Sequence, residues 1–505
     1  MSTSHSWNKS LRPPHKASRK GHSNLSSNNN PTPSASNNLV HTVNTSAPCV
    51  ENLETSKPRE SNSNRTNLSL TARPVAGIFF PQRPILRLNN HGYSPSVFQA
   101  VVTAAARLHS FADAAFAMSL GDVIISPRHV QTLTQEVSDE MVAARDAQVE
   151  ARRHRVLEPR VTMPPEVVVV EVDGGRVRTR AEGCGPGVHQ AEGKENKVAC
   201  LATLTKVACA EDPCPEPPPS FVEPRRIQRL VAQMKGAVSE AKAQENVGEP
   251  STDSDVSSAS DSSTSSTSDS NVSSTTPESE PWSPKRRVRT CVASLCDSSS
   301  FGPMMAAEAQ SRNFYAAGRR AFVADGAAYN WTIHRGYFRD FEPIVDLLHV
   351  ICYLFNAAHV LGVTVAEGWS RYKRWLRSVW QGRVQEVIDE LRVHQKELGR
   401  AGRGEELSVK DPRRVVHEAL TYLGNNASRM DYPRYRREGL PTTSSLAESL
   451  VGEVNARVKG RSKFWNRPSG VEGILQVRAA LLSEDGRLER FFANRPGHAF
   501  RRKAA

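Results

Sequence analysis

Residues 167–174 read VVVVEVDG, a run of β-branched side chains that closes with Asp173 and Gly174. β-branched residues favour the extended chain, so the run predicts a strand. Because Asp-Gly is also a strong hairpin signal, the sequence predicts strand, tight turn, strand around residues 173–175. Residues 320–326 repeat the form, with an apolar strand that ends in Asp325 and Gly326.

The two aspartates that end these strands are candidate metal ligands. Ligands bind at strand ends of open sheets, and carboxylates there hold hard cations such as Mg²⁺. Two such ions stabilise both oxygens of a phosphoryl displacement, a chemistry for which we expect a third acid. Glu448 can supply it from the first turns of a helix that Thr443-Ser444-Ser445 opens. The ordinary alternatives are a turn at each Asp-Gly pair and a surface acid at Glu448.

The chain divides into segments of different composition. Its hydrophobic fraction of 38% is low for 505 residues in one globule, which indicates unfolded parts. Residues 1–75 and 249–284, rich in Ser, Asn and Asp, predict a disordered tail and a disordered insertion. Residues 76–158 predict three helices that open at Ser94-Pro95, Ser110 and Ser126-Pro127. This order is consistent with a helix-turn-helix that binds DNA.

The remaining segments predict an α/β fold in which strands come first and helices later. Residues 159–341 hold both Asp-Gly strands, strands at 197–204 and 287–295, and helices at 225–245 and 304–317. Residues 342–438 predict helices at 344–361, 367–398 and 412–426. Residues 439–497 contain the Glu448 helix and a last helix at 471–482, and residues 498–505 form a basic tail.

The formal net charge of +13 predicts a polyanionic partner, either nucleic acid or an anionic membrane surface. The most apolar helical stretch, 344–363, contains Asp346 and His349, which are costly in hydrocarbon, so no membrane partner is expected. Residues 1–73 carry no apolar signal segment, and eight irregularly spaced cysteines form no disulfide pattern. We therefore expect a cytoplasmic protein.

Two kinds of basic stretch are candidate DNA contacts. The first kind alternates cations with aromatic residues, which suits phosphate contacts combined with stacking. It comprises Arg371, Lys373 and Arg374 around Tyr372 and Trp375, and residues 434–437, which read RYRR. The second kind follows the Glu448 helix and comprises Arg457, Lys459, Arg461 and Lys463. The alternative for the aromatic-interleaved stretches is a solvated helix face.

Several segments follow one another in the order of a known family. They are residues 93–95, 110–115, 170–174 (VEVDG), 193–197 (GKENK), 324–327 with Trp331, 345–349 (VDLLH), 439–451 (GLPTTSSLAESLV) and 455–460. These segments resemble the bacterial insertion-sequence DDE transposases of the Kra group, and the likeness covers roughly residues 90–497. The motif favours Glu448 over Glu453, which five helical residues turn away by roughly 140°.

The resemblance implies an RNase H-like core of the retroviral-integrase superfamily, interrupted by an all-α insertion. It implies that Asp173, Asp325 and Glu448 hold two Mg²⁺ or Mn²⁺ ions and catalyse the reaction. Asp346, His349 and Trp331 would be auxiliary residues, with a buried histidine and a packing tryptophan as the alternatives. The implied partners are double-stranded DNA, as terminal inverted repeats and as target, and further copies of the chain in a homo-oligomer. The implied location is the bacterial nucleoid.

The expected function is therefore DNA cleavage and strand transfer at the ends of an insertion sequence. Two other classes stay open: a catalytically inactive, domesticated DNA-binding protein, and an RNase H-like nuclease that cuts without strand transfer. The presence of all three acids argues against the first class. The helix-turn-helix pattern and the helical insertion argue against the second.

Overall fold

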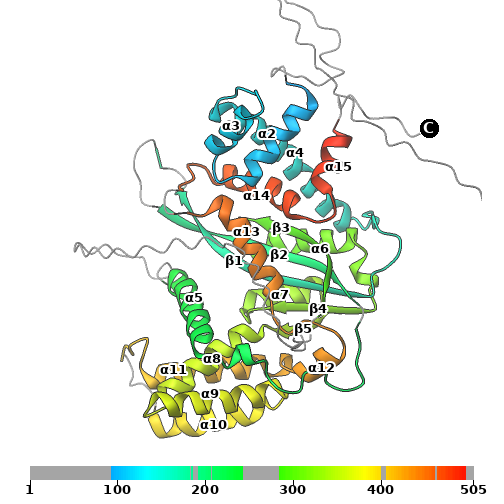
Figure 1. Cartoon of the computed structure of the whole chain (residues 1–505). Helices are drawn as coiled ribbons and strands as arrows, with labels where there is room; N and C mark the ends of the chain where they lie inside the picture. Colours follow the sequence, from blue (N-terminus) through cyan, green and yellow to red (C-terminus); the bar gives the residue numbers. More distant parts are fainter. Residues whose placement is uncertain are drawn as a thin grey trace, which may run out of the picture. The chain divides into compact units, whose positions relative to one another are not determined.

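The computed structural model describes residues 93–181, 184–185, 191–205, 207–242, 284–399, 405–460 and 463–495. The predicted tail 1–75, the basic tail 498–505 and the Ser-rich segment up to residue 283 lie outside the described residues. The described chain is a mixed α/β structure around one five-stranded sheet (Figure 1).

The sheet joins an antiparallel meander to two parallel strands. Its order is β3-β2-β1-β4-β5. β2 pairs antiparallel with both β1 and β3, whereas β4 pairs parallel with both β1 and β5. The strands are β1 (Val167–Arg180), β2 (Ala191–Leu204), β3 (Arg286–Ser294), β4 (Arg319–Ala324) and β5 (Glu342–Val345).

Strand β1 runs straight through the predicted turn. Residues 173–175 pair with residues 196–198 of β2, so the expectation of a hairpin there is wrong. Gly175 permits close packing instead, against helix α13 (Ser445–Val458). A Cβ on Gly175 would lie 2.8 Å from the Nδ2 atom of Asn455 in α13, closer than real Cβ atoms come. The missing side chain of Gly175 therefore lets α13 approach the sheet.

Helices cover both faces of the sheet. α13 contacts β1 and β2 on the face that carries Glu171, and it crosses in front of the strands in Figure 1. On the other face lie α6 (Ser298–Ser311) and α7 (Ala328–Tyr337). There Phe322 of β4 packs on Trp331 and Phe338. The expected helix at 304–317 thus begins and ends six residues earlier, and α7 was not predicted.

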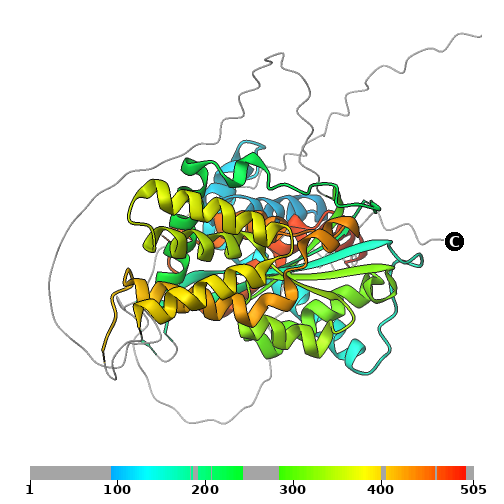
Figure 2. The ribbon, with the colours of Figure 1, turned by 90° about the horizontal axis from the view of Figure 1, so that it is seen from below.

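The predicted all-helical segment contains α8 (Leu347–Val360), α9 (Val365–Trp380), α10 (Val384–Leu398), α11 (Pro412–Asn426) and the short α12 (Tyr432–Arg437). The first four pack on one another (Figures 1 and 2). The single helix expected at 367–398 is wrong, because Gly382 breaks it with φ +78°, a conformation that favours glycine. Ile344 and Val345 form β5 rather than the start of α8. A short apolar run fits a buried strand and a buried helix equally.

The three N-terminal helices are confirmed, with the expected caps. α2 (Pro95–Arg107), α3 (Phe111–Ser119) and α4 (Pro127–Arg153) begin after Ser94, Ser110 and Ser126, whose side chains accept backbone N–H bonds. They share a second hydrophobic core with α14 (Pro468–Leu482) and α15 (Arg487–Asn494). The helical region expected at 76–158 is thus packed against the two last helices of the described chain.

Candidate active site

Three carboxylates stand in a row at the level where β4 and β5 end, beside the middle of β1. Val172 of β1 pairs with Ala324 of β4, which pairs with Val345 of β5. The next residue along each strand is an aspartate: Asp173, Asp325 and Asp346. Parallel pairing places these residues at one level, and Asp346 N donates to Ala324 O at 2.9 Å. The register therefore agrees with the expectation that Asp173 and Asp325 lie together. Asp325 follows the end of β4 as expected, whereas Asp173 lies inside β1, which continues to Arg180.

The loop after β4 holds Asp325 rigidly. Its Oδ1 atom accepts hydrogen bonds from Ala327 N and Asn330 Nδ2, both at 2.9 Å. Trp331 is 5% exposed, and its Nε1 donates to Gly326 O and to Asn426 Oδ1 of α11. Trp331 therefore packs and anchors this loop. Its buried ring offers no face to a DNA base in this conformation.

Gly326→Ala is expected to destabilise the protein and to displace Asp325. Gly326 has φ +91°, and an added Cβ would lie 2.8 Å from Tyr422 Cε2. We expect a loss of about 1–3 kcal/mol in the free energy of unfolding, measured by chemical denaturation. The control is Gly336→Ala in α7, where a Cβ meets open space. That variant should keep or raise stability, and an equal loss in both variants would contradict the argument.

Two buried carboxylates dock the N-terminal turn of α13. Glu171 is fully buried in β1, and its Oε2 accepts from Ala447 N at 2.8 Å. Asp346 is also fully buried, and its Oδ1 accepts from Ser444 N at 3.0 Å. These bonds flank Glu448 and fix it over the row of aspartates. Sequence reasoning missed Glu171, although a lone acid inside a valine run was a visible signal.

Asp346 also orients His349. Its Oδ2 lies 2.7 Å from His349 Nδ1, one helical turn further along α8. Burial alone would lower the pKa of His349, but the bond to Asp346 and the charges of Asp325 and Asp173 raise that pKa to about 9. His349 is thus a cation beside the carboxylate row, so the two residues belong to this site rather than to an unrelated part of the core.

Three carboxyl groups around the site, those of Asp173, Glu448 and Glu171, have raised pKa values. Burial raises the pKa of Asp173 to about 6, and the charges of Asp325 and Asp346 add to the rise. Burial, with the charges of Asp346 and Asp173, raises the pKa of Glu448 to about 7. Burial raises the pKa of Glu171 to about 8. Burial is the largest cause of all three shifts, and neighbouring negative charges add to it; a bound cation would offset both effects.

Glu453, the rival to Glu448, faces elsewhere. Its Oε1 accepts from Arg289 Nη2 of β3 at 2.7 Å. Glu448, in contrast, has a buried Oε1 with no hydrogen-bond partner. This difference favours Glu448 as the residue that reaches a ligand.

The chemistry of the donor set fits a hard cation. Asp173, Asp325 and Glu448 offer only carboxylate oxygens, and the orphan Oε1 of Glu448 lacks a partner that a metal ion would supply. As the side chains stand, no group of three or more His, Cys, Asp or Glu residues in the described part of the chain is arranged to hold a metal ion. Binding would therefore require the three side chains to draw together.

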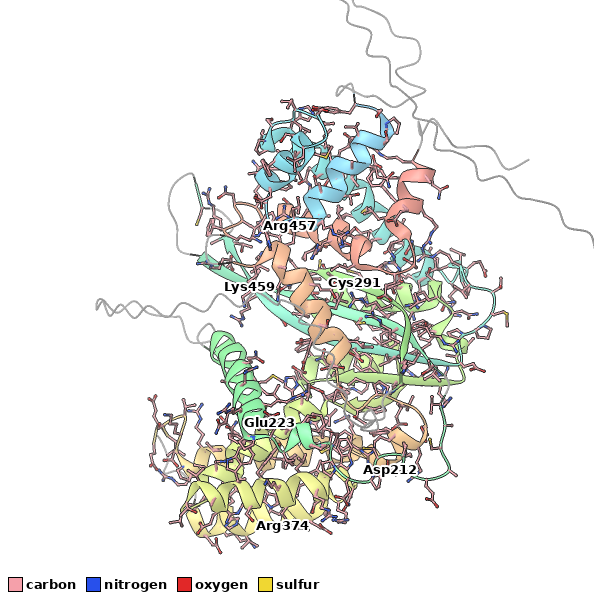
Figure 3. The ribbon with its side chains drawn as sticks, in the orientation of Figure 1. Asp212, Glu223, Cys291, Arg374, Arg457 and Lys459 are labelled. Atoms are coloured by element: carbon pink, nitrogen blue, oxygen red, sulfur yellow. The ribbon has the colours of Figure 1, made fainter. Side chains whose placement is uncertain are left out.

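Several of the aromatic-interleaved cations that were predicted to contact DNA have partners within the protein. Arg374 makes a two-pronged ion pair with Glu390 of α10, at 2.6 and 2.7 Å, and lies among the outer helices of the insertion (Figure 3). Arg371 bonds Ala358 O, and Lys373 is exposed. The neighbouring rings, Tyr372 and Trp375, are buried in the core and offer no stacking face.

Residues 434–437 are likewise engaged inside the protein. Arg434 pairs with Glu342 of β5, and Tyr435 is fully buried. Arg436 is 1% exposed, pairs with Asp212 and lies 4.1 Å from the centre of the Trp380 ring. These cations join distant segments of the chain, which is a structural role.

Arg457 is also a structural residue. It is 3% exposed at the end of α13, where Figure 3 labels it. Its Nε donates to Ala105 O at 2.7 Å and its Nη1 to His109 O at 3.2 Å, so it closes the C-terminal end of α2. Lys463 donates to Ala456 O and Arg457 O. Lys459 is exposed, and Arg461 lies outside the described residues.

Arg457→Met is expected to destabilise the fold without weakening DNA contacts directly. Loss of two charge-assisted bonds to buried carbonyls should cost about 2–3 kcal/mol of unfolding free energy. The salt dependence of DNA binding should stay unchanged, whereas loss of a phosphate contact would lower its slope by about 0.9. Arg467→Met, at an exposed position, is the control for stability. A lower slope with unchanged stability would restore Arg457 as a DNA contact.

The sequence matches no protein-family model, and no curated relative was found. Among the described residues, no helix has the length and apolar character needed to cross a membrane. The fold class is therefore mixed α/β on the evidence of the sheet and helices themselves.

Proposed function

We propose that this protein is a DDE transposase that cuts DNA at the ends of an insertion sequence and joins it to a target. The observation that carries the proposal is the meeting of Asp173, Asp325 and Glu448. They come from β1, from the loop after β4 and from α13, and the charge of Asp325 acts on Asp173, as the charge of Asp173 acts on Glu448. Sequence positions so far apart come together at one strand-end edge, where phosphoryl-transfer sites are built.

The sheet supports an RNase H-like core for this proposal. A three-stranded antiparallel meander extended by two parallel strands is the arrangement expected of such a core. The helical insertion α8–α12 lies between β5 and α13, as the resemblance implies. Asp346 lies at the start of this insertion and accepts hydrogen bonds from Leu348 N of α8 and from Ser444 N, just before α13. The two ends of the insertion are therefore held together beside the site.

Asp173, Asp325 and Glu448 would hold the two Mg²⁺ or Mn²⁺ ions. Such ions, when bound, polarise the phosphate and stabilise the attacking and leaving oxygens. The chain's own contribution is position: Asn330 and Ala327 fix Asp325, while Glu171 and Asp346 fix the turn that carries Glu448. The protonated His349 adds a positive charge beside the carboxylates that a DNA phosphate would approach.

The helices α2, α3 and α4 would bind the terminal repeats as a helix-turn-helix-like region. They pack on α14, which contacts α13. Terminal-repeat DNA bound to these helices would therefore be connected, through direct helix packing, to the helix that carries Glu448. Two element ends must be handled together, which favours a homo-oligomer bound to double-stranded DNA in the cytoplasm.

A strand-transfer assay tests the proposal. Duplexes that carry the DNA flanking the gene are incubated with the protein, Mn²⁺ and a circular target, and nicked and joined products are separated on a gel. Joined products support the transposase. Cleavage without joining would instead indicate a nuclease, and specific binding without cleavage would indicate an inactive DNA-binding protein.

A further inference from the structure

Three arginines open helix α5 (Pro224–Lys242), outside the basic stretches described above. Arg225, Arg226 and Arg229 are all exposed. Within the described residues, no hydrogen bond or ion pair engages any of the three. This separates them from Arg374, Arg434 and Arg436, whose charges are met by Glu390, Glu342 and Asp212.

The three arginines project from a helix whose other side is fixed. Ile227 and Val231 are 0% and 4% exposed and belong to the main core, against which Leu230 and Met234 also pack. α5 contacts α8, the helix that Asp346 caps, and rises from it at the border of the helical insertion (Figure 1). The buried apolar side of α5 therefore fixes the orientation of the helix, and the three arginines face solvent on its other side.

The clustering of these three arginines destabilises the protein when no anion is bound to them. Arg225 and Arg229 are four residues apart, and Arg226 and Arg229 three apart, so like charges meet on one helix surface. The only acid in the helix sequence is Glu240, in its last turn. Glu223, just before the helix, lies at its base in Figure 3. A neighbouring anion would relieve this repulsion, and guanidinium groups match the oxygens of a phosphate diester in pairs.

The geometry points to this face of α5 as a contact surface for the backbone of double-stranded DNA. This inference rests on the proposed function, which makes DNA the partner, and adds where the duplex lies. The contacts are to phosphates and carry no sequence information, so they suit target DNA, which the enzyme must accept in many sequences. The duplex on α5 lies next to α8, whose first turn borders the carboxylate row.

The test compares two triple variants of the full-length chain. One carries Arg225→Gln, Arg226→Gln and Arg229→Gln. The control carries Arg377→Gln, Arg383→Gln and Arg392→Gln, which removes the same charge from exposed arginines that are paired with Glu216, Glu386 and Asp389. Affinity for a short duplex of random sequence is measured by fluorescence anisotropy over a range of salt concentrations.

The α5 triple is expected to bind the duplex about 10- to 100-fold more weakly at moderate salt. Its slope of log affinity against log salt should fall by about 2–3, close to 0.9 for each lost phosphate contact. The control should change affinity less than about threefold. Equal effects in both triples, or an unchanged slope, would overturn the inference while leaving the transposase proposal in place.

Two further outcomes are informative. If the natural chain binds no duplex, the proposed function and this inference both fall. If the α5 triple binds the duplex normally but loses binding to anionic phospholipid vesicles, the surface serves a membrane and the DNA assignment is wrong.

Discussion

Asp325→Asn is expected to lower the rate of Mn²⁺-dependent DNA cleavage by about 10³-fold or more, because a neutral amide supplies several kcal/mol less stabilisation to a bound cation. The amide keeps an oxygen that accepts from Ala327 N and Asn330 Nδ2, so the loop should keep its shape. DNA affinity and the unfolding midpoint should therefore stay close to those of the natural chain. The measurement is single-turnover cleavage of an end-labelled duplex.

Asp340→Asn is the matched control, since Asp340 is an exposed acid on the loop between α7 and β5. It removes the same charge at the opposite end of β5, away from the carboxylate row. Equal cleavage by Asp325→Asn and the natural chain would mean that another site or a contaminant cuts DNA, and the assignment of Asp325 would fail. A parallel loss in both variants would point to a general effect of charge.

Glu171→Leu is expected to lower cleavage by about 10²-fold with DNA affinity unchanged. Leucine cannot accept the Ala447 N–H, so the first turn of α13 loses an anchor and Glu448 is displaced, and misplacement of about 1 Å can cost this much. The fold should survive, because an apolar side chain suits a fully buried position between valines. Hydrogen exchange of a peptide spanning residues 444–450 should rise in parallel.

Glu171→Gln separates positioning from charge. Its amide oxygen can still accept from Ala447 N, so cleavage and exchange should stay within about threefold of the natural chain. The exchange measurement reads the docking of α13 even if no cleavage is found. Glu171→Leu with natural cleavage and exchange, or Glu171→Gln as damaged as Glu171→Leu, would show that the hydrogen bond to Ala447 does not position Glu448.

Much of the fold could be predicted from the sequence because its signals are local. A run of β-branched residues marks β1, a short apolar run marks β4, and serine caps mark the starts of α2, α3 and α4. The errors arose where one pattern serves two structures. Asp-Gly-Gly fits a turn and also a strand against which a helix packs closely, and Ile344-Val345 fits a strand and also a helix.

The DNA-contact predictions were the weakest, because a charge pattern does not name its partner. Arg436 meets Asp212 from 224 residues away, and Arg457 meets the carbonyl of Ala105 from 352 residues away. The sequence does not distinguish an arginine that binds an acid or a helix end in the folded protein from one that faces solvent. The pairs form only when the fold brings distant segments together.

The sequence by itself determined strands β1 to β4, the starts of α2, α3 and α4, and the local setting of Asp325 and Glu448, since each depends on neighbours along the chain. Only the tertiary structure decided that Asp346 completes the row of aspartates and that Glu171 holds the turn of Glu448. It also decided which cations remain available to a partner. These features depend on sheet register and on contacts between segments hundreds of residues apart, which no local pattern encodes.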